Sequence, residues 1–317
     1  MKPFENINKA YNSVFKQNEL SIGIVVPIEK YATGPVPTML DHLNRVKQVE
    51  DLGFKSIWIR DIPLNVPNFG DAGQTFDPFT YLGFLSGQTS EIALGISSIA
   101  LPLHHPLHVA KSATTIDQLS GGRLLLGVAS GDRFDEYPAM GIDYENRGEL
   151  FRESFNYIRK VQSDFPTFET KNYGNLTGTI DMLPKPTAHK IPMLMTGSSR
   201  QSLEWNAENA DQNNTIRQYR ELVAETQEFD KPFMQPMYLD LHEDANFKPQ
   251  SIPLGFRLGI NYLADYLDKL RSIGVNHLAL NLRFNSMNMD ETLDLIAKQV
   301  LPEFHSTEKI EQNAQTE

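Results

Sequence analysis

The sequence predicts an α/β fold of parallel strands covered by helices, and three observations support this prediction. The run Leu124–Ala129 is continuously apolar, as expected of a strand with helices on both of its faces. Apolar runs of strand length alternate along the chain with segments whose apolar residues recur at helical spacing. The junction from helix to strand also repeats, because Leu-Gly-Phe at residues 52–54 has a counterpart in Ile-Gly-Val at residues 273–275.

The predicted elements follow one another in a regular order. Each predicted strand is a short apolar run, and each predicted helix carries an apolar stripe on one face. The loop at residues 63–76 is long for a connection inside a compact domain, and residues 165–183 have a mixed character. The predicted strands cover residues 21–27, 54–60, 92–101, 124–129, 192–196 and 275–282, and the predicted helices cover residues 38–52, 77–85, 106–119, 145–161, 203–210 and 262–273.

Local signals mark several of the helix ends. Thr38 is placed to cap the first helix, since a threonine side chain can accept a hydrogen bond from the first turn. Asp77 followed by Pro78 is the arrangement that a helix start prefers. Gly121 and Gly122 follow the helix at residues 106–119, where a left-handed cap would end it.

Composition excludes several classes of function. The 317 residues have a formal net charge of −11 and no basic run, which disfavours a nucleic-acid partner and an anionic membrane surface. The absence of cysteine excludes thiolate nucleophiles, disulfides and thiolate metal sites, so redox chemistry has to come from a bound cofactor. The length is compatible with one large domain or with two.

The chain carries no recognisable targeting signal. Residues 1–20 mix charged and amide side chains with single apolar residues, unlike a signal or transit peptide. No apolar stretch approaches the ~20 residues that a membrane-spanning helix needs. We therefore expect a cytoplasmic protein without a membrane partner.

Residues 115–132 form the most specific pattern in the chain. They read Thr-Ile-Asp-Gln-Leu-Ser-Gly-Gly-Arg-Leu-Leu-Leu-Gly-Val-Ala-Ser-Gly-Asp, and Glu136, Tyr137 and Gly141 follow. This pattern resembles that of the bacterial-luciferase-like flavin oxidoreductases. Judged by motif order and spacing, the resemblance extends from about residue 21 to about residue 304.

The resemblance implies a fold and a reaction. It implies a single TIM-type (β/α)8 barrel domain at residues 21–304, with an N-terminal arm at residues 1–20 and a polar tail at residues 305–317. The expected cofactor is FMN, reduced by NAD(P)H or by a partner flavin reductase, and the expected reaction is a monooxygenation of a small organic substrate with O2. Members of the family commonly form homodimers, which we expect here as well.

Between residues 211 and 237 the chain departs from the family pattern. Relatives carry a strand with glycine and aromatic residues directly after the pair that matches Ala210 and Asp211, and this chain has no convincing strand there. The count of eight strands therefore rests on the resemblance. Two explanations stay open: a shortened or disordered sixth strand, or residues missing from this region.

The turn formed by Gly197, Ser198 and Ser199 is the best anion site on physical grounds. It lies between a predicted strand and a predicted helix, where backbone N–H groups and hydroxyls at a helix start favour a phosphate. An ordinary serine cap after a glycine turn is the alternative. The resemblance favours the phosphate, because the family holds the flavin phosphate at the matching turn.

The resemblance assigns further cofactor contacts to the ends of three strands. Ser97 and Ser98 lie inside an apolar run, where their hydroxyls can simply bond to the backbone, and Tyr137 can be an aromatic side chain that covers a loop. In relatives, the matching strand end packs against the flavin ring, and the tyrosine hydroxyl reaches the phosphate. The expected contacts are Trp58, Ser97, Ser98, Ser130, Gly131, Asp132 and Tyr137.

Arg60 and Asp61 stand where the family often has a Glu-His pair beside the reactive edge of the flavin. An arginine there can stabilise negative charge on the reduced ring or bind an anionic substrate. A structural ion pair between the two residues is an equally good explanation. His104, near the exit of the third strand, is a further candidate for the pocket, so Arg60, Asp61 and His104 are the catalytic candidates and the general acid or base stays open.

Other chemistries have less support. His104, His105 and His108 lack the spacing and the acidic partner of a helical zinc motif, so we expect no metal. The chain has no nucleophile elbow, Walker A sequence or dinucleotide-binding glycine motif. The open alternatives are hydride transfer with the deazaflavin F420 and a flavin-binding protein without catalysis.

Overall fold

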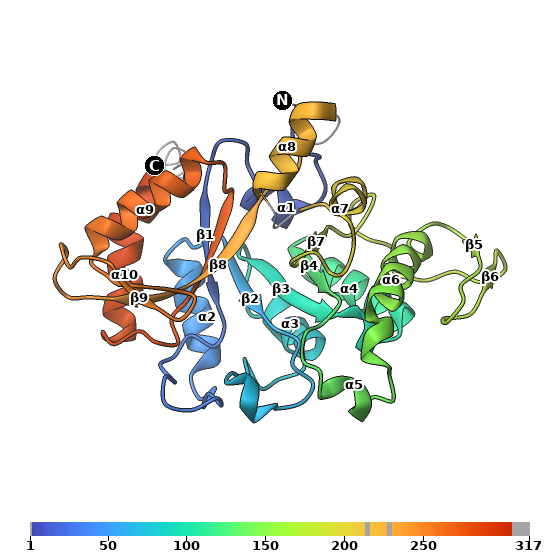
Figure 1. The fold of residues 1–317 in the computed structure, drawn as a ribbon, viewed down its shortest axis with the longest axis horizontal. Helices are drawn as coiled ribbons and strands as arrows, with labels where there is room; N and C mark the ends of the chain where they lie inside the picture. The colour runs from blue at the N-terminus through green and yellow to red at the C-terminus, as the bar shows by residue number, and fades with distance from the viewer. Residues whose placement is uncertain (1, 213–215, 227–229, 306–317) are drawn as a thin grey trace, which may run out of the picture.

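The computed structural model describes residues 2–212, 216–226 and 230–305. It contains strands and helices in alternation, as predicted, and Figure 1 shows the helices around a central sheet. The helices are α1 (Lys9–Val14), α2 (His42–Asp51), α3 (Pro78–Ser86), α4 (Pro106–Leu119), α5 (Glu136–Ala139), α6 (Arg147–Val161), α7 (Leu203–Asn209), α8 (Ile216–Thr226), α9 (Ile260–Ser272), α10 (Met289–Gln299) and α11 (Leu301–Phe304). The strands are β1 (Ser21–Val25), β2 (Ser56–Ile59), β3 (Ala93–Ala100), β4 (Leu124–Ala129), β5 (Thr167–Phe168), β6 (Leu176–Thr177), β7 (Met193–Met195), β8 (Met234–Leu241), β9 (Gln250–Ile252), β10 (Gly255–Leu258) and β11 (His277–Asn281).

The main sheet is that of a TIM-type barrel. Its strand order is β7-β4-β3-β2-β1-β11-β8-β10-β9, and the ladders from β7 to β8 are all parallel. The six strands predicted from the sequence are all present in this sheet, as β1, β2, β3, β4, β7 and β11. The strand β8 and the antiparallel hairpin of β9 and β10 were not predicted, because Gln235, Pro236 and Asp240 interrupt the apolar pattern of β8.

Among the described residues, the sixth strand position holds a single bridge. Gln212 forms an isolated parallel bridge with Leu194 of β7, and the backbone N–H of Asp211 donates to the Met193 carbonyl at 2.9 Å. In the described part of the chain the sheet stays open between β7 and β8. Residues 213–215, on which the expectation of a shortened sixth strand depends, lie outside the described residues.

Helix α1 closes the N-terminal end of the barrel. Tyr11 and Phe15 are buried in a cluster with barrel residues such as Leu125 and Trp58. The Tyr11 hydroxyl donates to the Asp211 carbonyl at 2.7 Å, and the Asn8 amide donates to Asp117 at 3.0 Å. The predicted N-terminal arm is therefore packed into the base of the barrel.

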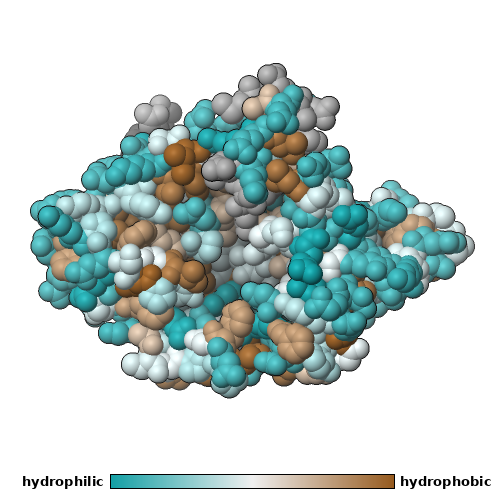
Figure 2. All heavy atoms as spheres, viewed as in Figure 1, coloured by the Kyte–Doolittle hydropathy of each residue, from teal (hydrophilic) through white to brown (hydrophobic). Residues whose placement is uncertain are grey.

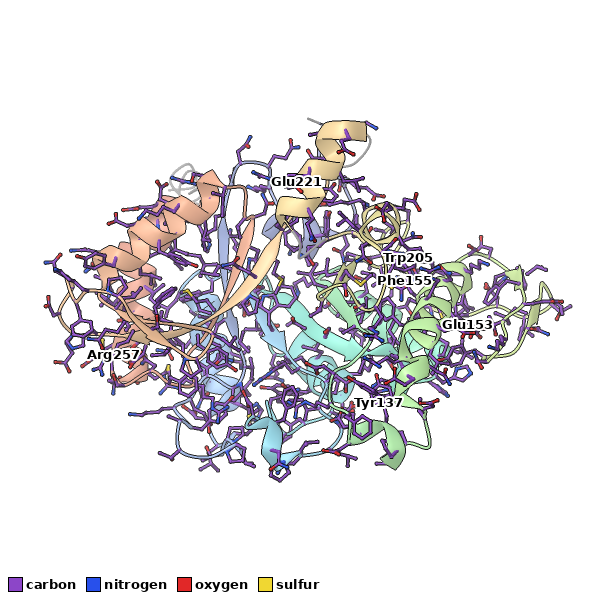
Figure 3. The ribbon with its side chains drawn as sticks, in the orientation of Figure 1. Tyr137, Glu153, Phe155, Trp205, Glu221 and Arg257 are labelled. Carbon is purple, nitrogen blue, oxygen red and sulfur yellow. The ribbon has the colours of Figure 1, made fainter. Side chains whose placement is uncertain are left out.

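The larger apolar core lies between the sheet and the surrounding helices. On one side of the barrel, Phe155 of α6 and Trp205 of α7 lie against each other, with ring centroids 5.1 Å apart (Figure 3). Figure 2 shows hydrophilic side chains over most of the visible surface, with apolar side chains in small groups. No helix of the described residues is long and apolar enough to cross a membrane.

One local prediction needs correction. Thr38 does not cap α2, which begins at His42; its backbone N–H and hydroxyl instead bond to the Glu29 carboxylate. Residues 165–183 form a loop that carries the short β5–β6 pair and projects from the body in Figure 1. In contrast, Asp77 caps α3 as predicted, accepting from the Thr80 N–H at 2.7 Å.

A bulge in β3 depends on a glycine in β4. The register between β3 and β4 shifts between Ile96 and Ile99, and the β3 backbone comes so close to β4 that a Cβ on Gly127 would lie 2.1 Å from the Ile96 carbonyl oxygen. A side chain at Gly127 would force the two strands apart. The bulge in β3 therefore requires a glycine at position 127.

We expect Gly127→Ala to lower the free energy of unfolding by about 2–3 kcal/mol, the cost of overpacking a rigid contact. Gly83→Ala in α3 is the control, because its Cβ would meet nothing within 4 Å; this change should stabilise the protein by about 0.5–1 kcal/mol. Chemical denaturation of both variants gives the comparison. Equal effects would contradict the role assigned to Gly127.

Candidate active site

A cavity of about 410 Å³ opens at the C-terminal ends of the parallel strands. Segments that follow β2, β4 and β7, together with the second half of β3, form its wall. TIM barrels place their ligands at this end, because the loops there bring residues from several strands together. The site residues predicted from the sequence that line this cavity are Arg60, Asp61, Ser97, Ser98, Ser130, Gly131, Asp132, Gly197 and Ser199.

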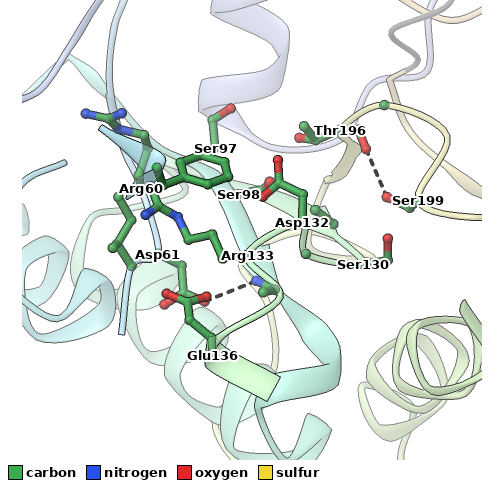
Figure 4. Close-up of a pocket in the computed structure, with 16 residues that line it drawn as sticks. Arg60, Asp61, Ser97, Ser98, Ser130, Asp132, Arg133, Glu136, Thr196 and Ser199 are labelled. Carbon is green, nitrogen blue, oxygen red and sulfur yellow. Dashed lines mark hydrogen bonds between the residues drawn. The ribbon is translucent and has the colours of Figure 1, made fainter. Parts of the chain in front are cut away.

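The bulge of β3 brings Ser97 and Ser98 to the middle of the wall. Both residues are half-buried and line the cavity, and the peptide bond between them is cis. Figure 4 shows them between the Arg60 side of the pocket and the Ser199 side. The sequence alone left open whether these serines bond to the backbone of the core or contact a ligand. In the structure they line the cavity, where a ligand can reach them.

The loop after β4 lies beside the bulge. Gly131 has a φ of +75° and lines the cavity, and a Cβ there would lie 2.6 Å from the Tyr137 hydroxyl oxygen. That hydroxyl donates to the Ser130 carbonyl, and the Tyr137 side chain is fully buried. Tyr137 thus holds the loop and does not line the cavity, which corrects the expectation that its hydroxyl reaches a phosphate directly.

The turn after β7 differs from its predicted form. Helix α7 begins only at Leu203, capped by Ser202, so the turn does not lead directly into a helix. Gly197, Ser199 and Arg200 instead have φ values of +59°, +47° and +62°, and the Ser199 hydroxyl donates to the Thr196 carbonyl at 2.9 Å (Figure 4). Ser198 is exposed and does not line the cavity.

Trp58 lies away from the cavity. Its side chain is 1% exposed, and the indole N–H donates to His277 Nε2 at 2.9 Å inside the barrel. Ser56 and Ser21 also bond to this imidazole, and burial lowers its pKa to about 3, so it stays neutral. This position contradicts the expectation that Trp58 contacts the cofactor, because its side chain points into the base of the barrel.

Arg60 belongs to a buried cluster centred on Asp71. Arg60 Nη1 lies 2.8 Å from the Asp71 carboxylate, and Arg283 Nη1 lies 3.2 Å from it. The hydroxyls of Tyr31 and Tyr238 donate to the same carboxylate at 3.2 and 3.1 Å. Burial alone would raise the pKa of Asp71, but the Arg60 charge and hydrogen bonds, with the help of Arg283, lower it below its ordinary value.

Asp61 pairs with His104 instead of with Arg60. His104 Nε2 lies 2.7 Å from Asp61 Oδ2, which also accepts the Ala100 N–H at 3.1 Å. Burial alone would lower the pKa of His104, but the hydrogen bond and charge of Asp61 raise it above its ordinary value. Asp61 lines the cavity while His104 lies behind it, and His105 caps helix α4.

Two charged residues in the wall were not predicted as site residues. Arg133 and Glu136 line the cavity and are 8% and 3% exposed. Burial raises the pKa of Glu136, and Arg133 partly offsets that effect. Their signal in the sequence was their place in the segment that follows a buried strand, where barrel enzymes carry functional residues.

A parallel barrel with a polar pocket at its C-terminal end is the architecture of TIM-barrel enzymes. The family model described as luciferase-like monooxygenase matches residues 20–228. The chain belongs to the family of luciferase-like monooxygenases.

Known relatives match part of the chain. The alkanal monooxygenase beta chain of Photorhabdus luminescens is 31% identical over 137 residues, which cover 43% of this chain and 39% of that protein. Limonene 1,2-monooxygenase of Rhodococcus erythropolis is 28% identical over 119 residues, which cover 38% of this chain and 30% of that protein. The chain therefore matches well under half of the length of each of these two relatives.

Solved structures show the same fold over most of the chain. The oxygenating constituent of 3,6-diketocamphane monooxygenase of Pseudomonas putida, in complex with FMN, has a TM-score of 0.68 at 15% identity and covers 90% of this chain and 99% of that one. An F420-dependent secondary alcohol dehydrogenase, in complex with an F420-acetone adduct, has a TM-score of 0.69 at 18% identity. The match covers 88% of this chain and 98% of that one.

We expect Asp61→Asn to lower the pKa of His104, because the histidine loses its charged partner. In the wild-type protein the pair stabilises the fold below about pH 6.5, and this contribution is lost as the pH rises through the raised pKa of His104. An NMR titration of the histidine side chains measures the change. His105, whose pKa is lowered by burial and by His108, is the internal control and should titrate alike in both proteins. An unchanged His104 titration would contradict the pairing.

Proposed function

We propose that the protein is a flavin-dependent oxidoreductase, and specifically an FMN-dependent monooxygenase that acts with reduced flavin and O2 on a small organic substrate. The observation that supports this most is the cavity itself, which combines the β3 bulge, the loop after β4 and the turn after β7 in one wall. Family membership supports the reaction class. The NAD(P)H or flavin-reductase supply of electrons, the homodimer and the cytoplasmic location remain part of this proposal.

The residues of the wall fit FMN. At one end, the turn at residues 197–200 exposes Gly197, above which a Cβ would meet nothing within 4 Å, so the backbone is open to a phosphate. In the middle, Ser97, Ser98 and Gly131 offer small side chains and backbone against which a flat ring can lie. Reduced FMN, when bound, would supply the electrons for O2 activation.

The charged residues at the other end would support the reaction. Arg60 brings a permanent positive charge that favours an anionic form of a bound ring or substrate. Asp61 lies at the wall with His104 behind it, so this pair can hold a proton next to the reacting groups. Ile62 and Phe69 provide an apolar cover that limits the access of water.

Hydride transfer with F420 is the second candidate, because two of the similar structures are described as F420-dependent. The longer charged tail of F420 would need cations near the turn after β7. Arg200 is exposed there, and Arg152 is anchored to Gln201 at 2.7 Å. A flavin-binding protein without catalysis is the remaining alternative. Steady turnover of a substrate would distinguish the two enzyme candidates from it.

We expect Gly197→Ala to weaken FMN binding about tenfold, since a methyl group on the open turn would displace one or two hydrogen bonds to the phosphate. Gly121→Ala is the matched control, because its φ of +65° causes similar backbone strain and its Cβ also meets nothing within 4 Å. Both variants should lose about 1 kcal/mol of stability. Titration of flavin fluorescence measures the affinity. Equal FMN affinities in the two variants would contradict a phosphate site at this turn.

We expect the protein to consume O2 with reduced FMN in the presence of a panel of small aldehydes and ketones. Asp61→Asn should lower this turnover about 100-fold while FMN binding is retained, because the proton-holding pair is lost. An oxygen electrode records the rates, and anaerobic assays with reduced and oxidised F420 run in parallel. Activity with F420 alone would select the second candidate, and FMN binding without turnover on any tested substrate would favour the non-catalytic alternative.

A further inference from the structure

Three buried polar atoms of the cavity wall have no hydrogen-bond partner among the described residues. They are Arg60 Nε, Arg133 Nη1 and Glu136 Oε1, and all three residues line the same cavity. A buried charged group without a partner costs free energy, so such atoms are rare unless a ligand or water meets them. No ion pair joins Arg133 to Glu136, although Glu136 begins α5 only three residues after Arg133.

The two arginines are held rigidly by one residue. Arg60 Nη1 contacts the Asp71 carboxylate at 2.8 Å, and Arg133 Nη2 donates to the Asp71 backbone carbonyl at 2.8 Å. The Arg133 guanidinium also stacks on Phe69, with its Cζ 4.0 Å from the ring centroid. Because both side chains are anchored on Asp71, the two guanidinium groups are held at one end of the cavity that their residues line.

Positive charge exceeds what Asp71 can neutralise. Asp71 pairs with Arg60 and Arg283, and its backbone alone meets Arg133. Glu136, the first residue of α5, is the nearest buried carboxyl to Arg133 in the sequence; burial raises its pKa, and the charge of Arg133 partly offsets that effect.

Two further carboxylates lie near this end of the pocket. Asp61 is bonded to His104 at 2.7 Å, so its charge is already shared with that imidazole. Asp132 is exposed to solvent, where its charge is screened. Neither carboxylate forms an ion pair within 4.0 Å with Arg60 or Arg133 in the described structure.

We propose that Arg60 and Arg133 bind the carboxylate of an anionic small-molecule substrate at this end of the pocket. A guanidinium has only donors, so its partner must supply acceptors, and a carboxylate matches two N–H groups in geometry and charge. Ile62, Phe69 and Ala100 line the same region and suit a small apolar body attached to that carboxylate. The inference deepens the proposed function and rests on it.

The position of the arginines separates this site from the phosphate end. Figure 4 shows Arg60 and Arg133 on one side of the pocket and Thr196 and Ser199 on the other, with Ser98 and Asp132 between them. A flavin whose phosphate lies at the turn after β7 would therefore leave the arginine end to the substrate.

The test compares hexanoate with hexanamide, its uncharged analogue of similar shape. Binding of each probe to the FMN-loaded protein and to the protein without FMN is measured by ligand-observed NMR, and FMN affinity is measured separately. We expect hexanoate to bind the FMN-loaded protein at least about tenfold more tightly than hexanamide. Arg133→Gln should weaken hexanoate binding about tenfold and leave FMN affinity within about twofold.

Arg271→Gln is the matched control, because Arg271 also stacks on an aromatic ring, at 5.0 Å from Phe304, but belongs to α9 outside the pocket. It should leave both affinities unchanged. Equal binding of hexanoate and hexanamide would overturn the carboxylate site. Loss of FMN affinity in Arg133→Gln, with hexanoate binding retained, would also overturn it and would place that guanidinium against the cofactor. Charge-selective hexanoate binding by a protein that does not bind FMN would support the anion site and refute the flavin proposal.

Discussion

The mouth of the barrel depends on one buried carboxylate. Asp71, in the loop after β2, is the common partner of side chains that follow or belong to five different barrel strands. These partners are Tyr31, Arg60, Arg133, Tyr238 and Arg283. Removing such a carboxylate would leave buried guanidinium groups without a counter-charge, which is far costlier than losing a surface ion pair. The loop at residues 63–76 thus brings Asp71 into contact with side chains from five barrel strands or the segments after them.

The pocket above this cluster has two chemically different ends. The turn after β7 offers backbone groups in left-handed conformations, and the opposite end offers fixed guanidinium groups and the Asp61–His104 pair. Between them, the β3 bulge provides a wall of small side chains, and Gly127 is what allows the bulge to approach β4. A cofactor with an anionic tail and a flat ring matches one end and the middle, and the remaining space matches a small acid.

Much of this arrangement could be predicted from the sequence. Continuous apolar strands, helix signals such as Asp77-Pro78 and the motif at residues 115–132 identified the barrel and most of the cavity wall. The contacts of Asp71 with Arg133 and Arg283 join residues that are far apart in the sequence, so no local pattern reveals them. Trp58 and Tyr137 were misplaced for a related reason: position within a motif does not tell which way a side chain points, and both side chains bond to the protein itself.

The central claim is that FMN lies along the wall from the turn after β7 to the β3 bulge. A crystal structure of the protein with FMN tests it most directly. We expect the phosphate at residues 197–200 and the ring against Ser97 and Ser98, with Arg60 and Arg133 beyond the ring. A phosphate bound to Arg60 and Arg133, or a flavin outside this cavity, would contradict the account.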